Sequence, residues 1–334
     1  FLVPLEKEYG KDSTDKSQAM RFRGLIQRAA EQEGRPVVIL VDEYDKPMLN
    51  AIGNPQLQEA FRSELKAFYS VLKSQDRYIK FAFLTGVTKF GKISVFSDLN
   101  HLFDISMTED FETICGFTEQ EIRDNFNEDV AALAQKNEIT IEEAYSQLKE
   151  NYDGYHFKRF QTKGMYNPFS VLFTFKNLRF NDYWFETGTP TYLVTLLQNY
   201  NYRLDELTQE QVTSDVLNSI DPSSQNPIPV IYQSGYLTIK DYRRDSDMYT
   251  LGVPNQEVRK GFAECLYRHV TKAKASSHTT SELIEAYYDF RDSDDLPQFI
   301  EAIKAFVAGV PYHWAQDNQN EHCYHALLYT LLVS

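Results

Sequence analysis

The sequence predicts an α/β fold in which the first third of the chain forms a parallel sheet with helices. Residues 37–41, Val-Val-Ile-Leu-Val, form a short apolar run, typical of a strand buried on both faces of a parallel sheet. A second run of this kind occupies residues 79–84. Residues 17–33 and 55–75 carry apolar side chains at helical spacing. Because helices alternate with the apolar runs, we expect right-handed crossovers between parallel strands.

Further elements follow along the chain. The helix predicted at 17–33 ends at a Gly-Arg-Pro sequence. Residues 102–106, Leu-Phe-Asp-Ile-Ser, are a candidate third strand. The pattern is helical over 116–152, and Thr118 with Glu121 forms a capping-box signature at the start.

The second half of the sequence predicts a helix-rich unit with a β-hairpin. Thr-Pro-Thr at 189–191 opens a helix, with Pro in its first turn. Residues 230–239 favour a short helix that turns into a strand, and 249–254 supply a partner strand. Residues 255–309 are mostly helical in pattern.

Composition limits the class of protein. The 334 residues are enough for two or three domains. The net charge of −14, without a basic block, disfavours nucleic-acid binding. No apolar run approaches the roughly 18 residues of a membrane helix. The chain does not begin with Met, and we expect a fragment. A reducing cytoplasm is expected, because the three cysteines show no Cys-x-x-Cys spacing: Cys115, Cys265 and Cys323.

Two neighbouring carboxylates, Asp42 and Glu43, directly follow the apolar run at 37–41. Open α/β sheets bind ligands outside the carboxyl ends of their strands. Nucleotide hydrolases of the P-loop class need such a pair there. Asp42 would hold Mg²⁺ through its water shell, and Glu43 would orient or deprotonate the attacking water. The alternative is an acidic turn that caps the next helix.

Seven short motifs occur in order along nearly the whole chain: Asp-Glu-Tyr-Asp-Lys-Pro at 42–47, Leu-Thr-Gly-Val-Thr-Lys-Phe at 84–90, Ser-Asp-Leu-Asn at 97–100, Cys-Gly-Phe-Thr at 115–118, Tyr-Asp-Gly-Tyr at 152–155, Tyr-Asn-Pro-Phe-Ser at 166–170 and Glu-Thr-Gly-Thr-Pro at 186–190. This series resembles the AAA-ATPase-like proteins, a bacterial family, in motifs and in their order. In that family a P-loop ATPase module is typically followed by a C-terminal nuclease domain of the PD-(D/E)XK type.

The resemblance implies roles for matching positions in the first motifs. Asp42 and Glu43 resemble the Walker B pair. Thr85 resembles the sensor-1 position, whose polar side chain contacts the γ-phosphate or the attacking water. The alternative for Thr85 is a hydroxyl that caps the turn before Gly86.

Three further positions are implied as nucleotide-binding. Lys89 would face phosphate or a neighbouring subunit, although a solvated surface lysine is the alternative. Gly188 and Pro190 resemble the Gly-x-Pro element that starts the winged-helix module of related signalling ATPases. In those ATPases the helix N-terminus approaches the nucleotide. The alternative is a simple helix start.

The sequence departs from the family in two places. No Gly-x-x-x-x-Gly-Lys-Ser/Thr loop is present, and in the family this loop precedes the region where the chain begins. Residues 322–332 look like the first helix of the nuclease domain, which is otherwise missing. His322 and His325 have metal-chelating spacing, but without a third ligand nearby we favour structural histidines.

We therefore expect a P-loop ATPase core with Walker B and sensor 1 (1–115), a helical lid and aromatic linker (116–185), a winged-helix-like domain (186–256) and a helical connector (257–334). The intact protein would bind and hydrolyse ATP with Mg²⁺ and control the attached nuclease.

Other interpretations stay open. One is a nucleotide-sensing or scaffolding module with little hydrolysis. Another is a nuclease in defence or mobile-element biology, with the ATPase as its regulator. A homo-oligomer also stays open. Nucleic-acid binding by this chain is not expected, because the candidate recognition segment at 230–236 has no positive charge.

Overall fold

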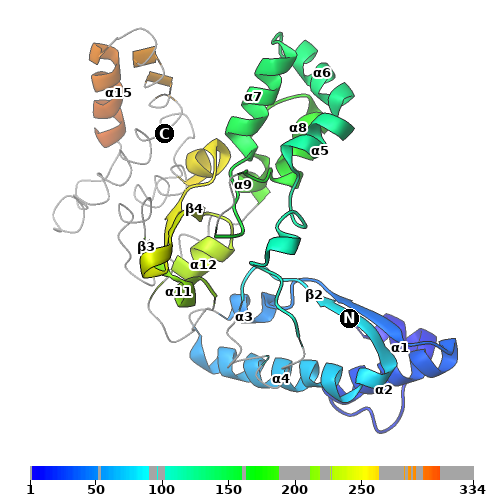
Figure 1. Ribbon diagram of the computed structural model, residues 1–334. Helices are drawn as coiled ribbons and strands as arrows, with labels where there is room; N and C mark the ends of the chain where they lie inside the picture. The colour runs from blue at the N-terminus through cyan, green and yellow to red at the C-terminus, as the bar shows by residue number, and fades with distance from the viewer. Residues whose placement is uncertain are drawn as a thin grey trace. The chain divides into compact units, whose positions relative to one another are not determined.

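The computed structural model describes residues 2–51, 54–89, 96, 102–159, 163–187, 211–218, 226, 228–262, 282, 285–286, 289–290 and 296–308. It is a mixed α/β fold with a parallel pair of strands and a separate antiparallel sheet (Figure 1). Its named elements are α1 (Val3–Tyr9), α2 (Gln18–Glu33), β1 (Val37–Val41), α3 (Lys46–Asn50), α4 (Pro55–Ser74), η1 (Asp76–Tyr78), β2 (Ile79–Leu84), η2 (Glu109–Phe111), α5 (Glu119–Asn125), α6 (Asn127–Lys136), α7 (Ile141–Tyr152), α8 (Pro168–Asn177), α9 (Tyr183–Thr187), β3 (Gln211–Thr213), α11 (Ser214–Asn218), α12 (Ile228–Gln233), β4 (Thr238–Arg243), η4 (Arg244–Ser246), β5 (Met248–Gly252) and α15 (Leu296–Ala308).

The chain divides into two compact units. Unit 1 comprises Phe1–Asp104 and Asp215–Ser234, and unit 2 comprises Ile105–Ser214 and Gly235–Ser334. The sequence-based domain boundaries at 115, 185 and 256 stay predictions.

Unit 1 is built on two parallel strands, as the sequence predicts. β1 pairs with β2 in parallel register, from Val37 opposite Ile79 to Val41 opposite Leu84. Ile39 points from β1 into a core formed with α2 and α4. The buried members of this core are Leu2, Phe22, Leu25, Ile26, Ile39, Tyr69, Val71 and Leu72.

The expectation that these strands are buried on both faces is wrong. The side chains of Val38, Leu40 and Phe81 are exposed. They alternate with the inward-facing positions, since successive strand residues point to opposite faces. Both α2 and α4 contribute to the core on the Ile39 side. The apolar runs therefore give the correct strands but overstate the burial of one face.

The predicted limits of α2 are confirmed. The Ser17 side chain accepts a hydrogen bond from the Met20 backbone N–H and caps the first turn. Gly34 ends the helix in the left-handed conformation, with φ of 65°, which glycine adopts at low cost.

The third strand expected at 102–106 is absent. These residues lie in the described part of the chain but pair with no described strand. Ile105 instead begins a turn, in which its carbonyl accepts both the backbone N–H and the hydroxyl of Thr108, at 3.2 and 3.0 Å.

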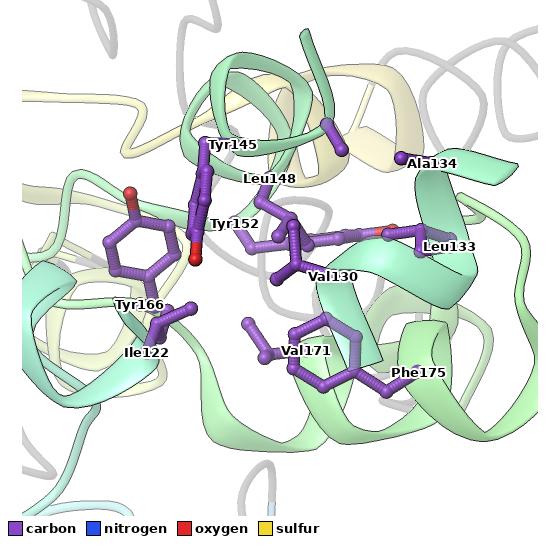
Figure 2. Close-up of a cluster of buried hydrophobic side chains, with 11 residues drawn as sticks. Ile122, Val130, Leu133, Ala134, Tyr145, Leu148, Tyr152, Tyr166, Val171 and Phe175 are labelled. Carbon is purple, nitrogen blue, oxygen red and sulfur yellow. The ribbon is translucent and has the colours of Figure 1, made fainter. Parts of the chain in front are cut away.

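In unit 2, α5, α6 and α7 lie within the range predicted to be helical, 116–152, whereas α8 lies in the segment expected to be an aromatic linker. Helices α5, α6, α7 and α8 share a buried core, and Figure 2 shows its side chains converging from these helices. The capping box at Thr118 and Glu121 is confirmed at the start of α5. A second box, Thr140 with Glu143, starts α7.

The predicted β-hairpin is also confirmed. β4 and β5 pair antiparallel, and β3 adds a third strand beyond β5. α12 precedes β4 along the chain, as the pattern at 230–239 predicts. The helix predicted to open at 189–191 and the histidines at 322 and 325 lie outside the described residues. Across the described residues, no helix has the length and apolarity required to span a membrane.

Candidate functional site

Asp42 and Thr85 meet where β1 and β2 end. The Thr85 hydroxyl donates to Asp42 Oδ1 at 2.6 Å. Thr85 continues the parallel pairing by one residue, because its N–H donates to the Val41 carbonyl at 2.8 Å. Parallel strands bring their carboxyl ends to the same edge, so two residues far apart in sequence become neighbours. The structure thus brings together the first two predicted site residues.

Glu43 has an unusual backbone. Its φ is +53°, in the left-handed region that non-glycine residues seldom adopt. Its N–H donates to Asp42 Oδ1 at 3.0 Å, which supports the turn. Glu43 Oε2 pairs with Lys46 Nζ at 2.6 Å, and both side chains are exposed. Donation to Glu43 raises the pKa of Lys46. Non-glycine residues with positive φ cluster at functional sites, so the backbone of Glu43 is consistent with a functional role.

Asp45 is the buried acid of the same segment. Its side chain accepts the Val87 N–H at 3.3 Å on Oδ1, and the Thr88 N–H and hydroxyl at 2.5 and 2.6 Å on Oδ2. Asp45 also precedes α3, but its carboxylate makes no capping bond to that helix. Burial, and then the charge of Asp45, raise the pKa of nearby Tyr69 to about 12.

Gly86 allows the two strand ends to approach. A Cβ at Gly86 would lie 2.6 Å from Asp45 Oδ1 and 2.7 Å from the Tyr44 ring. Tyr44 itself contacts the same loop: its N–H donates to the Thr85 carbonyl and its hydroxyl to the Thr88 carbonyl. A side chain at position 86 would therefore separate these contacts.

The remaining predicted residues are placed only in part. The Lys89 ammonium pairs with Asp104, and its backbone N–H donates to Gln233 Oε1, which ties the loop to α12 within unit 1. A role for Lys89 toward phosphate stays a prediction. Gly188 and Pro190 lie outside the described residues.

Unit 2 contains a buried acid that the sequence analysis missed. Glu257 has no exposed surface. Its carboxylate accepts the Ser170 hydroxyl at 2.7 and 2.9 Å and the Trp184 N–H at 2.7 Å. Burial raises its pKa to about 7. Ser170 belongs to the Tyr-Asn-Pro-Phe-Ser motif, but no local pattern links that motif to position 257.

Asp42, Glu43 and Thr85, which we call the strand-end cluster, have the oxygen ligands that suit a hydrated Mg²⁺. Mg²⁺ prefers oxygen ligands and is commonly held by one or two carboxylates, with waters and substrate phosphates completing its shell. Asp42 supplies a carboxylate and Thr85 a hydroxyl, 2.6 Å apart. Asp42 and Glu43 are exposed, so a ligand can reach both. The residues present therefore fit this ion.

Comparisons with known proteins cover the region that contains these residues. Residues 2–96, which include the whole strand-end cluster, match the AAA-ATPase-like family, described as "Predicted AAA-ATPase". No solved structure matches the chain. A protein of Azotobacter chroococcum mcd 1, described as "Uncharacterized protein in vnfD 5'region", is 33% identical over 321 residues, which are 95% of this chain and 59% of that protein. The chain thus spans less than two thirds of this relative's length.

Proposed function

We propose that the protein is a Mg²⁺-dependent ATPase and that this chain supplies its Walker B and sensor-1 residues. The observation that carries the proposal is the 2.6 Å hydrogen bond from Thr85 to Asp42, next to Glu43, at the carboxyl ends of two parallel strands. Ligands of open α/β sheets bind at this edge. The similarity of residues 2–96 to the predicted AAA-ATPase family supports the same function.

Each side chain then has one role. Asp42 would hold the ion through water, and Glu43 would orient the attacking water and accept its proton. Thr85 would direct its hydroxyl toward the γ-phosphate or that water. When bound, Mg²⁺ would neutralise the charge that develops on the phosphate oxygens.

A nucleotide-sensing module with little hydrolysis is the second candidate. It is favoured by the ion pair between Glu43 and Lys46, at 2.6 Å, which engages the oxygen that would otherwise accept a proton. Water screens an exposed pair of this kind, so it is weak and a bound ligand can displace Lys46. The two candidates differ in turnover and not in nucleotide binding.

Glu43→Gln in the full-length protein separates them. Because glutamine cannot accept the proton, we expect turnover to fall by roughly 100-fold or more while ATP affinity is retained. Turnover is measured by phosphate release and affinity by calorimetry.

Glu301→Gln is a matched control. Glu301 forms the same kind of exposed lysine pair, with Lys304 three residues along and an oxygen–nitrogen distance of 2.6 Å. This control should retain wild-type turnover. Equal turnover in wild type and Glu43→Gln would exclude the role of Glu43, and nucleotide binding without any wild-type turnover would favour the sensing module.

Control of a nuclease domain and a cytoplasmic location are further parts of the proposal. The nuclease would belong to sequence outside this chain, and its coupling can be tested by comparing DNA cleavage by full-length wild type and Glu43→Gln with and without ATP. Cleavage that does not respond to ATP would contradict the coupling.

A further inference from the structure

The loop after β2 is held on both sides of Gly86. Before it, the Thr85 N–H donates to the Val41 carbonyl and the Thr85 carbonyl accepts the Tyr44 N–H, at 2.8 and 3.0 Å. After it, residues 87–88 donate three hydrogen bonds to the Asp45 carboxylate. The Thr85 hydroxyl therefore lies on a short segment whose two ends are fixed by residues 41–45.

Asp45 is suited to this position by its chemistry. Its side chain is 1% exposed, and the groups that meet it are two backbone N–H groups and one hydroxyl, all donors. A carboxylate accepts on both oxygens, whereas asparagine must direct an NH₂ group toward one set of these donors. Leaving a buried donor without an acceptor is costly because the donor has lost its hydrogen bonds to water, so the loop would move to find another partner.

We propose that Asp45 is a positioning residue for the proposed ATP hydrolysis. By anchoring Val87 and Thr88, Asp45 keeps the Thr85 hydroxyl against Asp42. Asp45 itself is buried and makes no contact with the reacting groups. This inference rests on the proposed function, because Asp45 would affect the rate of ATP hydrolysis only by positioning the Thr85 hydroxyl.

A double-mutant cycle in the full-length protein tests the inference. We expect Asp45→Asn to lower kcat roughly tenfold or more, with KM for ATP within about twofold of wild type, since small misplacements of catalytic groups cost rate more than binding. Thr85→Val removes the hydroxyl and keeps the side-chain shape. In that background, Asp45→Asn should have almost no further effect, because the group that it positions is gone.

A second pair of variants leaves the buried carboxylate in place and so perturbs the fold less than Asp45→Asn does. Thr88→Val removes one of the three bonds to Asp45, and Thr88→Ser keeps the hydroxyl. We expect Thr88→Val to lower kcat and Thr88→Ser to retain it.

Hydrogen exchange gives a readout that needs no nucleotide. The amides of Val87 and Thr88 both donate to Asp45, so their exchange in the peptide containing residues 85–88 should be faster in Asp45→Asn and unchanged in Thr88→Ser. Exchange in Asp45→Asn equal to wild type would overturn the inference.

The kinetic outcomes distinguish the inference from the function on which it rests. If Thr85→Val lowers kcat but Asp45→Asn does not, or if Asp45→Asn lowers kcat by the same factor in both backgrounds, the positioning role is wrong and the proposed function stands. If Thr85→Val hydrolyses ATP like wild type, the sensor-1 role of Thr85 and the positioning role of Asp45 are both overturned, while the ATPase activity itself stands. A wild-type protein that does not hydrolyse ATP would overturn the proposed function.

Discussion

At the scale of single residues, the acidic side chains differ in their exposure to water and in the hydrogen-bond donors around them. Asp42 and Glu43 are exposed at the strand ends, whereas Asp45 is buried among donors. Glu257, in unit 2, is buried too, but its donors do not offset the loss of water. Burial is the leading cause that raises its pKa to about 7, and the nearby charge of Asp182 acts in the same direction.

The raised pKa of Glu257 makes stability depend on pH. The folded state binds the proton more tightly than the unfolded state, whose pKa is near 4.5. The free energy of unfolding should therefore fall as pH rises from about 4.5 to about 7, then level off, with a total loss of about 3 kcal/mol.

Glu257→Gln removes this charge. Glutamine stays neutral at every pH and can still accept the Trp184 N–H and donate to the Ser170 hydroxyl. Relative to wild type, the variant should gain about 3 kcal/mol between pH 5 and pH 8, measured by urea denaturation. Parallel pH curves for the two proteins would contradict the expected ionisation of Glu257.

At the scale of elements, local signals set where helices begin. α5 and α7 both start with a threonine whose hydroxyl accepts the N–H of a glutamate three residues on, while that glutamate accepts the threonine N–H. These bonds satisfy donors that the first helical turn leaves without partners. The sequence predicts this box at Thr118 because all the interacting groups lie within four residues.

Thr140→Ala tests the contribution of one box. The variant loses the bond from the Glu143 N–H to the Thr140 hydroxyl, 3.2 Å long, at the start of a helix that buries Leu148 and Tyr152. We expect the free energy of unfolding to fall by about 1 kcal/mol in urea denaturation. Thr140→Ser keeps the hydroxyl and should stay close to wild type. Equal losses in both variants would assign the effect to the lost methyl group.

The strands show the limit of local signals. β1 and β2 occupy the predicted residues, and their parallel pairing follows from the intervening helices. The run at 102–106 also contains apolar residues, but it is interrupted by Asp104 and pairs with no described strand. The exposure of Val38, Leu40 and Phe81 depends on which elements pack against the sheet.

At the scale of the whole molecule, charge argues against DNA binding by this chain. The net charge is −14. The β4–β5 hairpin, the wing of the expected winged helix, contains three basic residues (Lys240, Arg243 and Arg244) and three acidic ones (Asp241, Asp245 and Asp247). A balanced hairpin on an acidic protein provides little counterion release.

We therefore expect no measurable affinity of residues 1–334 for duplex DNA at physiological salt. Fluorescence anisotropy with a labelled duplex checks this, with the salt concentration varied. A salt-dependent rise in anisotropy at nanomolar protein would contradict the prediction.

The sequence by itself determined the strands that carry Asp42 and Thr85 and the convergence of these residues at one sheet edge. Apolar runs, helical spacing and the order of elements are sufficient for this, since they are local or follow from chain topology. Only the tertiary structure decided that Glu43 pairs with Lys46, that Asp45 anchors the loop after β2, and that Glu257 is buried against Ser170. These contacts depend on side-chain directions, and all but the first also depend on packing between segments distant in sequence, where no local pattern specifies the partner.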